Sequence, residues 1–257
     1  MDLIADHISH RFGALEVLEN VSFTVGAGEV VAIVGPSGCG KSTMLSILGG
    51  LLRPSAGAAE LRGAPPPDSR NPLTFVFQDF ALLPWCSVEE NVEFPLLHMA
   101  LSVGERRAIV GDALRRTSLS DFRATYPKQL SGGMRQRVGI ARALAVRPAI
   151  LLMDEPLSAL DSQTRELLME DFIRLLADGS MGAVYVTHNL EEAVRLADRI
   201  VVLSRRPGRI REVVSIPMTR GERGDIAARE KLLALQSQLW SLIREEAIDA
   251  EREVQHA

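Results

Sequence analysis

Gly35-Pro36-Ser37-Gly38-Cys39-Gly40-Lys41-Ser42-Thr43 directly follows the apolar run Val30–Val34. An apolar run, a glycine-rich loop and a Lys-Ser pair in this order match the phosphate-binding P-loop, which leads from a strand into a helix. The glycines let the loop aim backbone N–H groups at a polyphosphate, and the positive end of the following helix dipole adds to the attraction. Lys41 can reach the terminal phosphates, and the Ser42 hydroxyl can ligate Mg²⁺. The segment therefore predicts binding of a nucleoside triphosphate.

The bulk composition is ordinary for a soluble globular protein of one large or two small domains, with 257 residues, 46% hydrophobic and 24% charged. Its net charge of −4 argues against a nucleic-acid binder. Two cysteines, one of them in the P-loop, give no disulfide framework and predict a cytosolic protein. No segment approaches the ~20 apolar residues needed to cross a bilayer, and no signal peptide is recognisable at the N-terminus.

Strands and helices alternate along most of the chain. The first 30 residues alternate apolar and polar side chains, as in 3–8 and 21–25, which predicts antiparallel strands with one solvated face. A helix is expected from Lys41 to about Leu52, and a strand from Leu73 to Phe77. Further strands are expected at 149–153, 183–187 and 199–203, separated by helices near 162–178 and 190–198. This order predicts an α/β fold with a doubly wound, mainly parallel sheet.

Residues 87–146 have a different character and predict a helical subdomain inserted into the sheet. Two capping boxes, Ser87 with Glu90 and Ser102 with Glu105, each open a helix, and a third helix follows Ser131. The remaining tail, residues 216–257, carries Leu232, Leu235, Leu239 and Ile243 at helical spacing. We expect a helix docked on the core, with a partner-binding or regulatory role as the alternative.

The apolar run 150–153 ends in Asp154 and Glu155, which is the Walker B pattern. Doubly wound sheets hold their ligands at the carboxyl ends of the strands, where these two acids would lie. Asp154 would hold Mg²⁺ directly or through water, and Glu155 is placed to act as general base on the attacking water, a role worth about 10²–10⁴-fold in rate. Such an acidic strand end is weak evidence alone and strong evidence beside a P-loop.

Leu130-Ser131-Gly132-Gly133-Met134-Arg135-Gln136-Arg137 contains a second candidate phosphate site. Ser131 can cap the helix that it begins, and Gly132 and Gly133 leave bare N–H groups at the positive end of that helix. A capped helix after a glycine turn would be the purely structural interpretation of the same residues. Two half-sites for one triphosphate in a single chain favour an arrangement in which the halves meet across a dimer.

The segment around Ser131-Gly132-Gly133 resembles the signature motif of ATP-binding cassette (ABC) ATPases, and other motifs follow in the order of that family. Gln78 closes a segment that resembles the Q-loop, and 158–161 resembles the D-loop ending in Asp161. His188 matches the switch histidine, and Phe12 lies where the family has an aromatic residue that stacks on adenine. The resemblance covers residues 1–215. It implies a P-loop NTPase fold with an N-terminal antiparallel β subdomain. Met134 departs from the glutamine that is commonest in the signature.

The resemblance also implies a mechanism. Two copies would close head to tail around two ATP molecules, each ATP lying between the P-loop of one copy and the signature of the other. Catalysis would rest on Glu155, His188 and Lys41, and Mg²⁺ would be held by Ser42, Gln78 and Asp154. The nucleotide would be bound by Phe12, Gly35, Pro36, Ser37, Gly38, Cys39, Gly40, Lys41, Ser42, Thr43, Gln78, Ser131, Gly132, Gly133, Asp161 and His188.

The expected partners are membrane proteins. Residues 80–85 are rich in large apolar side chains, and in the family this region forms a groove for a short helix of the membrane-spanning subunit. Core packing within the subdomain is the alternative interpretation. The permease subunits would be separate polypeptides served by a substrate-binding protein, with this chain peripheral on the cytoplasmic face of the inner membrane. Leu82–Trp85 together with Ser204–Ile210 resembles the nitrate, sulfonate and taurine import class, although the basic turn 204–210 could equally be a solvated loop.

Two other functions are alternatives to a transport ATPase. A soluble ABC ATPase acting on nucleic acid or ribosomes usually has two cassettes in one chain or a long coiled-coil insertion, and this acidic chain shows neither. A P-loop kinase is the more distant alternative, because the signature motif argues against it. The sequence analysis therefore favours the ATPase subunit of an importer for a small anion such as nitrate, sulfonate or taurine.

Overall fold

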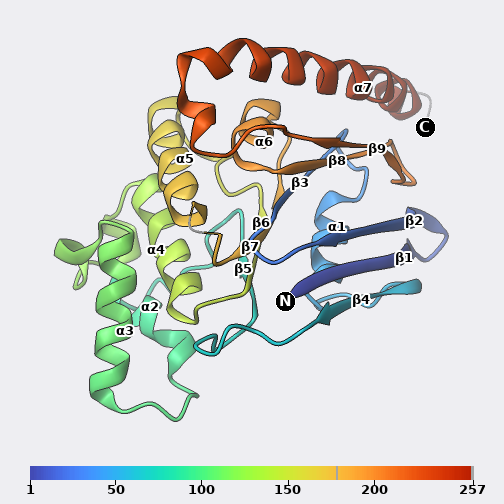
Figure 1. The fold of residues 1–257 in the computed structure, drawn as a ribbon. Coiled ribbons are helices and arrows are strands. Elements are labelled where there is room, and N and C mark those ends of the chain that lie inside the picture. Colours follow the sequence, from blue (N-terminus) through green and yellow to red (C-terminus); the bar gives the residue numbers. More distant parts are fainter. Residues whose placement is uncertain (178, 256–257) are drawn as a thin grey trace.

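A computed structural model describes residues 1–177 and 179–255. It contains two sheets, a six-stranded sheet in the order β5-β6-β7-β3-β8-β9 and a three-stranded sheet in the order β2-β1-β4 (Figure 1). The strands are β1 (Asp2–Phe12), β2 (Leu15–Val25), β3 (Val30–Val34), β4 (Ala56–Arg62), β5 (Leu73–Val76), β6 (Ile150–Asp154), β7 (Gly182–Val186), β8 (Arg199–Leu203) and β9 (Ile210–Ser215).

The larger sheet is parallel except at one edge. β5, β6, β7, β3 and β8 pair in parallel, and β9 pairs antiparallel with β8. All five residues of β3 are buried, as expected for a central strand covered on both faces. The predicted α/β fold, with its mainly parallel sheet, antiparallel N-terminal sheet and inserted helices, is confirmed. The expected strands 149–153 and 183–187 are each shifted by one residue.

The helices are α1 (Lys41–Leu48), α2 (Val88–Glu93), α3 (Val103–Arg116), α4 (Gly132–Ala145), α5 (Ser162–Leu176), α6 (Leu190–Leu196) and α7 (Arg229–Gln255). The prediction that the first helix runs to about Leu52 was wrong, because Gly49 and Gly50 end it at Leu48; Gly50 takes a left-handed φ of 71°. Residue 178, the expected end of α5, lies outside the described residues, as do 256–257 of the tail.

The two faces of the parallel sheet bury separate cores. Val31 and Ile33 of β3 pack with α1 and the antiparallel sheet, whereas Val30, Ala32 and Val34 pack with α4, α5, α6 and α7. Alternate residues of one strand therefore serve opposite layers. β3 is thus packed on both faces, and this packing fixes the position of the P-loop, which follows its carboxyl end.

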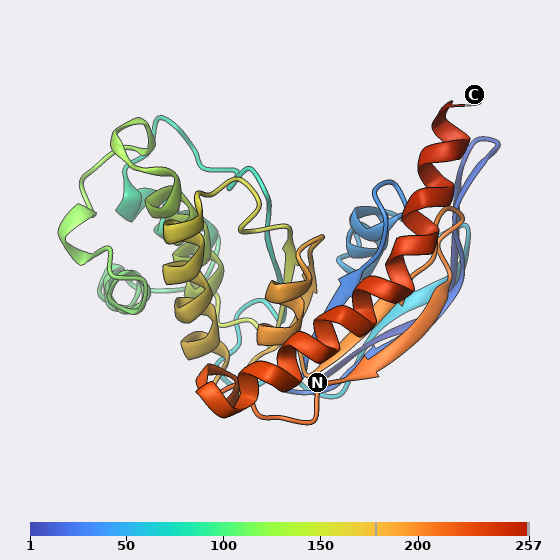
Figure 2. The same ribbon diagram turned by 90° about the horizontal axis from the view of Figure 1, so that it is seen from above.

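The inserted helices α2, α3 and α4 share a core of their own that includes Val92, Leu114 and Val138. Both predicted capping boxes are present. The backbone N–H of Ser87 donates to Glu90 at 2.6 Å, and that of Ser102 donates to Glu105 at 2.7 Å. This helical part projects to one side, away from the antiparallel sheet (Figure 2).

The tail forms the long helix α7. It runs across the molecule from beside α5 to the side that holds the antiparallel sheet (Figure 2). Leu232, Leu239 and Ile243 are buried in the core that also contains α5 and α6, as the leucine spacing predicted. Among the described residues, no helix combines the length and the apolar character that crossing a bilayer requires.

Candidate functional site

The predicted site residues converge on one edge of the parallel sheet. β5, β6, β7 and β3 are consecutive neighbours, and Gln78, Glu155, His188 and the P-loop each follow the carboxyl end of one of these strands. Parallel strands expose their carboxyl ends at the same edge, which is where doubly wound sheets bind ligands. Residues that lie more than a hundred positions apart in the sequence are therefore brought to a single site.

The P-loop wraps around the start of α1. Gly38 and Gly40 have left-handed φ angles of 75° and 102°, which glycine adopts without steric cost. Lys41 is buried, and its ammonium donates to the carbonyl oxygens of Gly35 and Pro36, both at 2.9 Å. The cation is thus held within the loop, while Ser37 and Gly38 remain exposed. A loop of this shape presents N–H groups and a positive charge to a polyphosphate.

Ser42 and Asp154, both predicted metal ligands, are in direct contact. The Ser42 hydroxyl donates to Asp154 Oδ1 at 3.1 Å, which links α1 to the end of β6. Partial burial raises the pKa of Asp154, and the neighbouring Glu155 charge adds to that shift while the Ser42 hydrogen bond opposes it. A hard divalent cation prefers oxygen ligands and would stabilise the charged carboxylate. The donor set at this point therefore fits Mg²⁺.

Glu155 and His188 face each other at the sheet edge. His188 Nδ1 lies 3.1 Å from Glu155 Oε2. Glu155 has a left-handed φ of 43°, which is strained for a residue with a side chain. Its N–H donates to the Val186 carbonyl at 2.9 Å, and its carbonyl accepts from the Ser158 hydroxyl at 2.9 Å. These bonds tie the glutamate to β7 and to the following turn, and thereby maintain its unusual backbone.

Gln78 reaches toward the same turn, since its side-chain amide donates to the Ser158 hydroxyl at 3.2 Å. The next residues form a strained bend in which Phe80 and Ala81 both have left-handed φ angles, of 64° and 43°. Arg142 of α4 holds this bend by donating to the carbonyls of Phe80 and Ala81 at 2.8 and 2.6 Å. The segment after Gln78 is therefore attached to the helical part.

Ser131, Gly132 and Gly133 lie at the start of α4. The Ser131 hydroxyl accepts from the Met134 N–H at 3.2 Å, which confirms the predicted helix cap. A Cβ atom on Gly133 would lie 2.3 Å from Thr164 Cγ2, so a glycine is needed for α4 to approach α5. A Cβ atom on either glycine would come closest to side chains of residues 160–168, and α4 packs on the face of the parallel sheet opposite to α1, which follows the P-loop. The structure thus places the two predicted phosphate sites of one chain apart.

Asp161 and Phe12 complete the set of sequence-predicted residues. Asp161 caps α5 by accepting from the N–H groups of Gln163 and Thr164 at 3.1 and 3.0 Å, and the bonds from Thr164 contribute most to lowering its pKa. Phe12 ends β1 with 51% of its surface exposed, and its ring lies edge-on to His10 at 4.6 Å. An exposed aromatic face of this kind is available for stacking.

Comparison with known proteins agrees with this geometry. The family described as ABC transporter matches residues 18–158. The chain belongs to the ABC transporter family. It is therefore an ATP-binding ATPase whose activity is coupled to transport.

Relatives of this ABC ATPase carry related names. It is 48% identical over 200 residues to the taurine import ATP-binding protein TauB of Burkholderia pseudomallei, which covers 78% of this chain and 77% of that protein. It is 42% identical to TauB of Chromobacterium violaceum, covering 92% and 94% of the two chains. It is also 42% identical to the bicarbonate transport ATP-binding protein CmpD of Synechocystis, covering 81% and 75%.

Among solved structures, this ABC ATPase resembles the ATP-binding cassette MJ0796, which was determined as a dimer in a post-hydrolysis state with ADP and Pi. The TM-score is 0.72 at 36% identity, and the match covers 84% of this chain and 99% of that one.

One buried polar cluster of the ABC ATPase was missed by the sequence analysis. Glu192 of α6 is 4% exposed and accepts from the hydroxyls of Tyr185 and Thr187, both at 2.8 Å. Burial, with the adjacent Glu192, raises the pKa of Tyr185 well above its ordinary value. Glu192 lies three residues after Asn189, the N-cap of α6, and this local spacing gives no sign that its side chain turns inward.

The cluster extends to the turn after Walker B. Arg165 of α5 lies 3.8 Å from Glu192 and donates to the carbonyl of Leu160 at 2.8 Å and, at 3.4 Å, to that of Leu157. Since Thr187 directly precedes His188, this chain of contacts joins the turn before Asp161 to the loop that carries the histidine. Glu192, Tyr185, Thr187 and Arg165 are referred to below as the Glu192 cluster.

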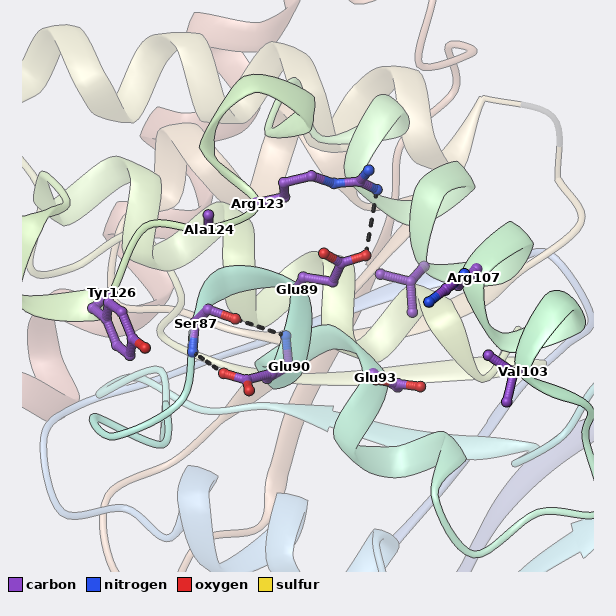
Figure 3. A pocket seen from close by; sticks show the side chains of 10 residues that line it. Ser87, Glu89, Glu90, Glu93, Val103, Arg107, Arg123, Ala124 and Tyr126 are labelled. Atoms are coloured by element: carbon purple, nitrogen blue, oxygen red, sulfur yellow. Dashed lines mark hydrogen bonds and ion pairs between the residues drawn. The ribbon is translucent and has the colours of Figure 1, made fainter.

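A hollow of about 850 Å³ lies in the helical part (Figure 3). It is bordered by α2, α3 and the loop through Arg123 and Tyr126, and five of its ten lining residues are charged. Glu89 and Arg123, two of its lining residues, form an ion pair at 3.5 Å. None of the residues predicted to bind nucleotide or metal lines this hollow.

Proposed function

We propose that this chain is the ATP-hydrolysing subunit of an ABC importer and that it acts as a homodimer in which each ATP lies between two copies. The observation that carries the proposal is the separation of two complementary half-sites in one chain. The P-loop and the Glu155–His188 pair share the sheet edge, whereas Ser131–Gly133 start α4 beside α5. A second copy placed head to tail supplies the missing half to each site.

The residues of the sheet edge have distinct roles in this proposal. Lys41 and the N–H groups of Gly38 and Gly40 bind the phosphates, and Phe12 stacks on adenine. Ser42, Asp154 and Gln78 hold Mg²⁺, which when bound neutralises charge that develops on the transferred phosphoryl group. The hydrogen bond between the Ser42 hydroxyl and Asp154 Oδ1, at 3.1 Å, brings two of these ligands together and supports this assignment.

Glu155 accepts the proton of the attacking water, and His188 orients the glutamate and the terminal phosphate. Their separation of 3.1 Å lets His188 donate to Glu155 and hold it in position. Asp161 lies in the turn that faces the second copy and links the two sites. Ser131, Gly132 and Gly133 of the second copy donate to the terminal phosphate from the opposite side.

The membrane partner is proposed to dock beside the bend after Gln78. Trp85 is 73% exposed, and the bend is attached to α4 by Arg142. An exposed tryptophan on an anchored segment is suited to burial against a partner. Because Gln78 belongs to the same segment, nucleotide binding and permease position would change together. The chain is then peripheral on the cytoplasmic face of the inner membrane, and a substrate-binding protein delivers cargo to the permease.

The cargo is proposed to be a small compound that carries an anionic group, of the nitrate, sulfonate or taurine class. The names of the relatives in Chromobacterium and Synechocystis, for taurine import and bicarbonate transport, support this range. Taurine is the first compound to test, by uptake into vesicles that contain the ATPase with its co-purified permease and binding protein. Uptake of nitrate or bicarbonate without taurine uptake would reassign the cargo within the class.

The dimer and the general base are tested by one substitution. We expect Glu155→Gln to bind ATP, lose hydrolysis and elute as a dimer in size-exclusion chromatography with light scattering when ATP and Mg²⁺ are present. Glu191→Gln, at an exposed acid of α6, is the control and keeps both hydrolysis and the wild-type elution. A Glu155→Gln protein that stays monomeric with ATP and still hydrolyses it would refute the proposal.

The docking segment is tested by Trp85→Glu. We expect this variant to keep ATPase activity in solution but to lose co-purification with the permease. Trp240→Glu is a matched control, because Trp240 is also exposed, at 55%, but lies on α7. Normal assembly of the Trp85→Glu complex would exclude this segment as the docking surface.

A further inference from the structure

The basic turn Ser204–Arg209 connects β8 to β9 and is closed by its own hydrogen bonds. The Ser204 N–H donates to the Arg209 carbonyl at 2.9 Å, and the Arg209 N–H donates to the Ser204 hydroxyl at 3.0 Å. The same hydroxyl donates to the Arg205 carbonyl at 3.0 Å. These bonds give the turn a defined shape, so it is not the freely solvated loop that its composition allowed.

The turn is also bonded to β2, an edge strand of the antiparallel sheet. The Gly208 N–H donates to the Val17 carbonyl at 2.8 Å, and the Gly208 carbonyl accepts from the Glu19 N–H at 3.0 Å. The side chains of Arg209 and Glu19 form an ion pair. Two backbone hydrogen bonds and this ion pair therefore fix the turn on β2.

Gly208 lies directly against the P-loop. It is buried, and a Cβ atom placed on it would lie 2.2 Å from the carbonyl oxygen of Cys39. Real Cβ atoms do not approach backbone oxygens so closely, so a side chain here must displace either the turn or the loop. The P-loop thus rests on a surface made by Gly208 and β2; a Cβ atom on Gly40 would likewise lie 3.1 Å from the Val17 carbonyl.

The tail helix holds the other side of the turn. Glu246 of α7 accepts from the Arg205 N–H at 3.0 Å and pairs with the Arg211 guanidinium at 2.9 Å. Arg205 lies within the turn and Arg211 lies just beyond it, so one carboxylate spans both ends. The pair is mostly shielded, with Arg211 29% and Glu246 21% exposed. Figure 1 shows the end of α7 lying over β8 and β9.

We propose that α7 sets the affinity for ATP by holding the turn Ser204–Arg209 against the P-loop, with Gly208 as the positioning residue. The contacts run from Glu246 through Arg205 to Gly208 and from there to the Cys39 carbonyl. Substitution of Glu246 or of Gly208 therefore loosens or shifts the P-loop, whose N–H groups bind the phosphates. The inference rests on the proposed role of the P-loop, and it gives the basic turn and the tail a function in nucleotide binding.

The test measures binding of the non-hydrolysable analogue AMP-PNP with Mg²⁺ by isothermal titration calorimetry on the full chain. Gly208→Ala is expected to weaken binding about ten-fold, because the added methyl overpacks the contact. Gly221→Ala is the matched control, since a Cβ atom there meets nothing within 4 Å and its φ of −65° suits alanine. Glu246→Ala is expected to weaken binding about two- to three-fold, and Glu230→Ala, at an exposed acid of the same helix, leaves it unchanged.

The double variant, which carries both Gly208→Ala and Glu246→Ala, tests whether the two substitutions weaken AMP-PNP binding through the same contacts. If α7 acts through the turn, Glu246→Ala adds no further loss once Gly208→Ala is present. In steady-state assays the KM for ATP rises by a larger factor than kcat falls, because Glu155 and His188 lie outside this chain of contacts whereas Lys41 belongs to the loop that it positions. A general loss of folded protein would instead lower kcat at constant KM, which circular dichroism melting would also show.

Specific results overturn the inference. If Gly208→Ala binds AMP-PNP with wild-type affinity, the turn has no role in nucleotide binding. If Glu246→Ala and Glu230→Ala bind it with equal affinity, α7 has no such role. If Gly208→Ala fails to fold, the comparison of Glu246→Ala with Glu230→Ala decides alone. Failure of the wild-type chain to bind AMP-PNP would refute the proposed function itself, which separates the two ideas.

Discussion

The Glu192 cluster allows a stability prediction to be worked out from individual atoms. Tyr185 and Thr187 both donate to the same oxygen, Glu192 Oε2, at 2.8 Å, and the carboxylate is nearly fully buried. In Glu192→Ala both hydroxyls lose their acceptor, and each unsatisfied buried group costs about 1–3 kcal/mol. Arg165 loses a countercharge at 3.8 Å, but it is about one-third exposed and adds little. We expect a loss of about 3–5 kcal/mol in the free energy of unfolding.

The variant Glu192→Gln separates hydrogen bonding from charge. A glutamine oxygen can accept from both hydroxyls, but its NH₂ group then faces the Arg165 guanidinium, so we expect a smaller loss of about 1–2 kcal/mol. The measurement is urea unfolding followed by circular dichroism, with Glu191→Ala as the control because that acid is adjacent and exposed. If the free energy of unfolding of Glu192→Ala lies within about 1 kcal/mol of that of the Glu191→Ala control, this account of the cluster is refuted.

Three further predictions concern single sites. Because burial raises the pKa of Asp154, its charged form destabilises the fold; stability is greatest with the acid protonated and falls as the pH rises through its folded pKa. Asp154→Asn should therefore raise the melting temperature of the nucleotide-free protein at pH 7, with the gain shrinking toward acid pH; no gain at pH 7 would contradict this. Burial also raises the pKa of Cys39, so iodoacetamide at pH 8 should modify the less buried Cys86 first in peptide mass spectrometry, and equal rates would count against the burial. A Cβ atom on Gly49 would lie 2.0 Å from the Phe75 ring, so Gly49→Ala should lower stability by about 1–3 kcal/mol in urea unfolding, and an unchanged midpoint would exclude that contact.

Local signals in the sequence predicted most of the fold. Capping boxes at Ser87 and Ser102 depend on residues three positions apart, and the structure shows both. The buried run before the P-loop has no periodicity because β3 is covered on both faces. The strand β4 was not predicted, because its sequence of small and charged residues carries little strand preference and its pairing with β1 supplies the hydrogen bonds.

The candidate site was predicted as a set of motifs, but its contacts were not. The motifs place residues after strands, whereas the strand order brings His188 to Glu155 and Ser42 to Asp154. The inward turn of Glu192 depends on Tyr185 and Thr187 of a neighbouring strand end. Contacts of this kind come from tertiary packing, and single-sequence patterns do not contain them.

The left-handed backbone of Glu155 has a consequence for engineering. Any procedure that replaces residues according to their preferred dihedral angles would select glycine or asparagine at this position, since both tolerate a φ of 43° better than glutamate does. The resulting protein would fold more readily and melt at a higher temperature, yet it would lack the carboxylate that faces His188. Thermostabilisation libraries for this chain should therefore hold position 155 fixed, because a screen for solubility alone would enrich inactive transporters.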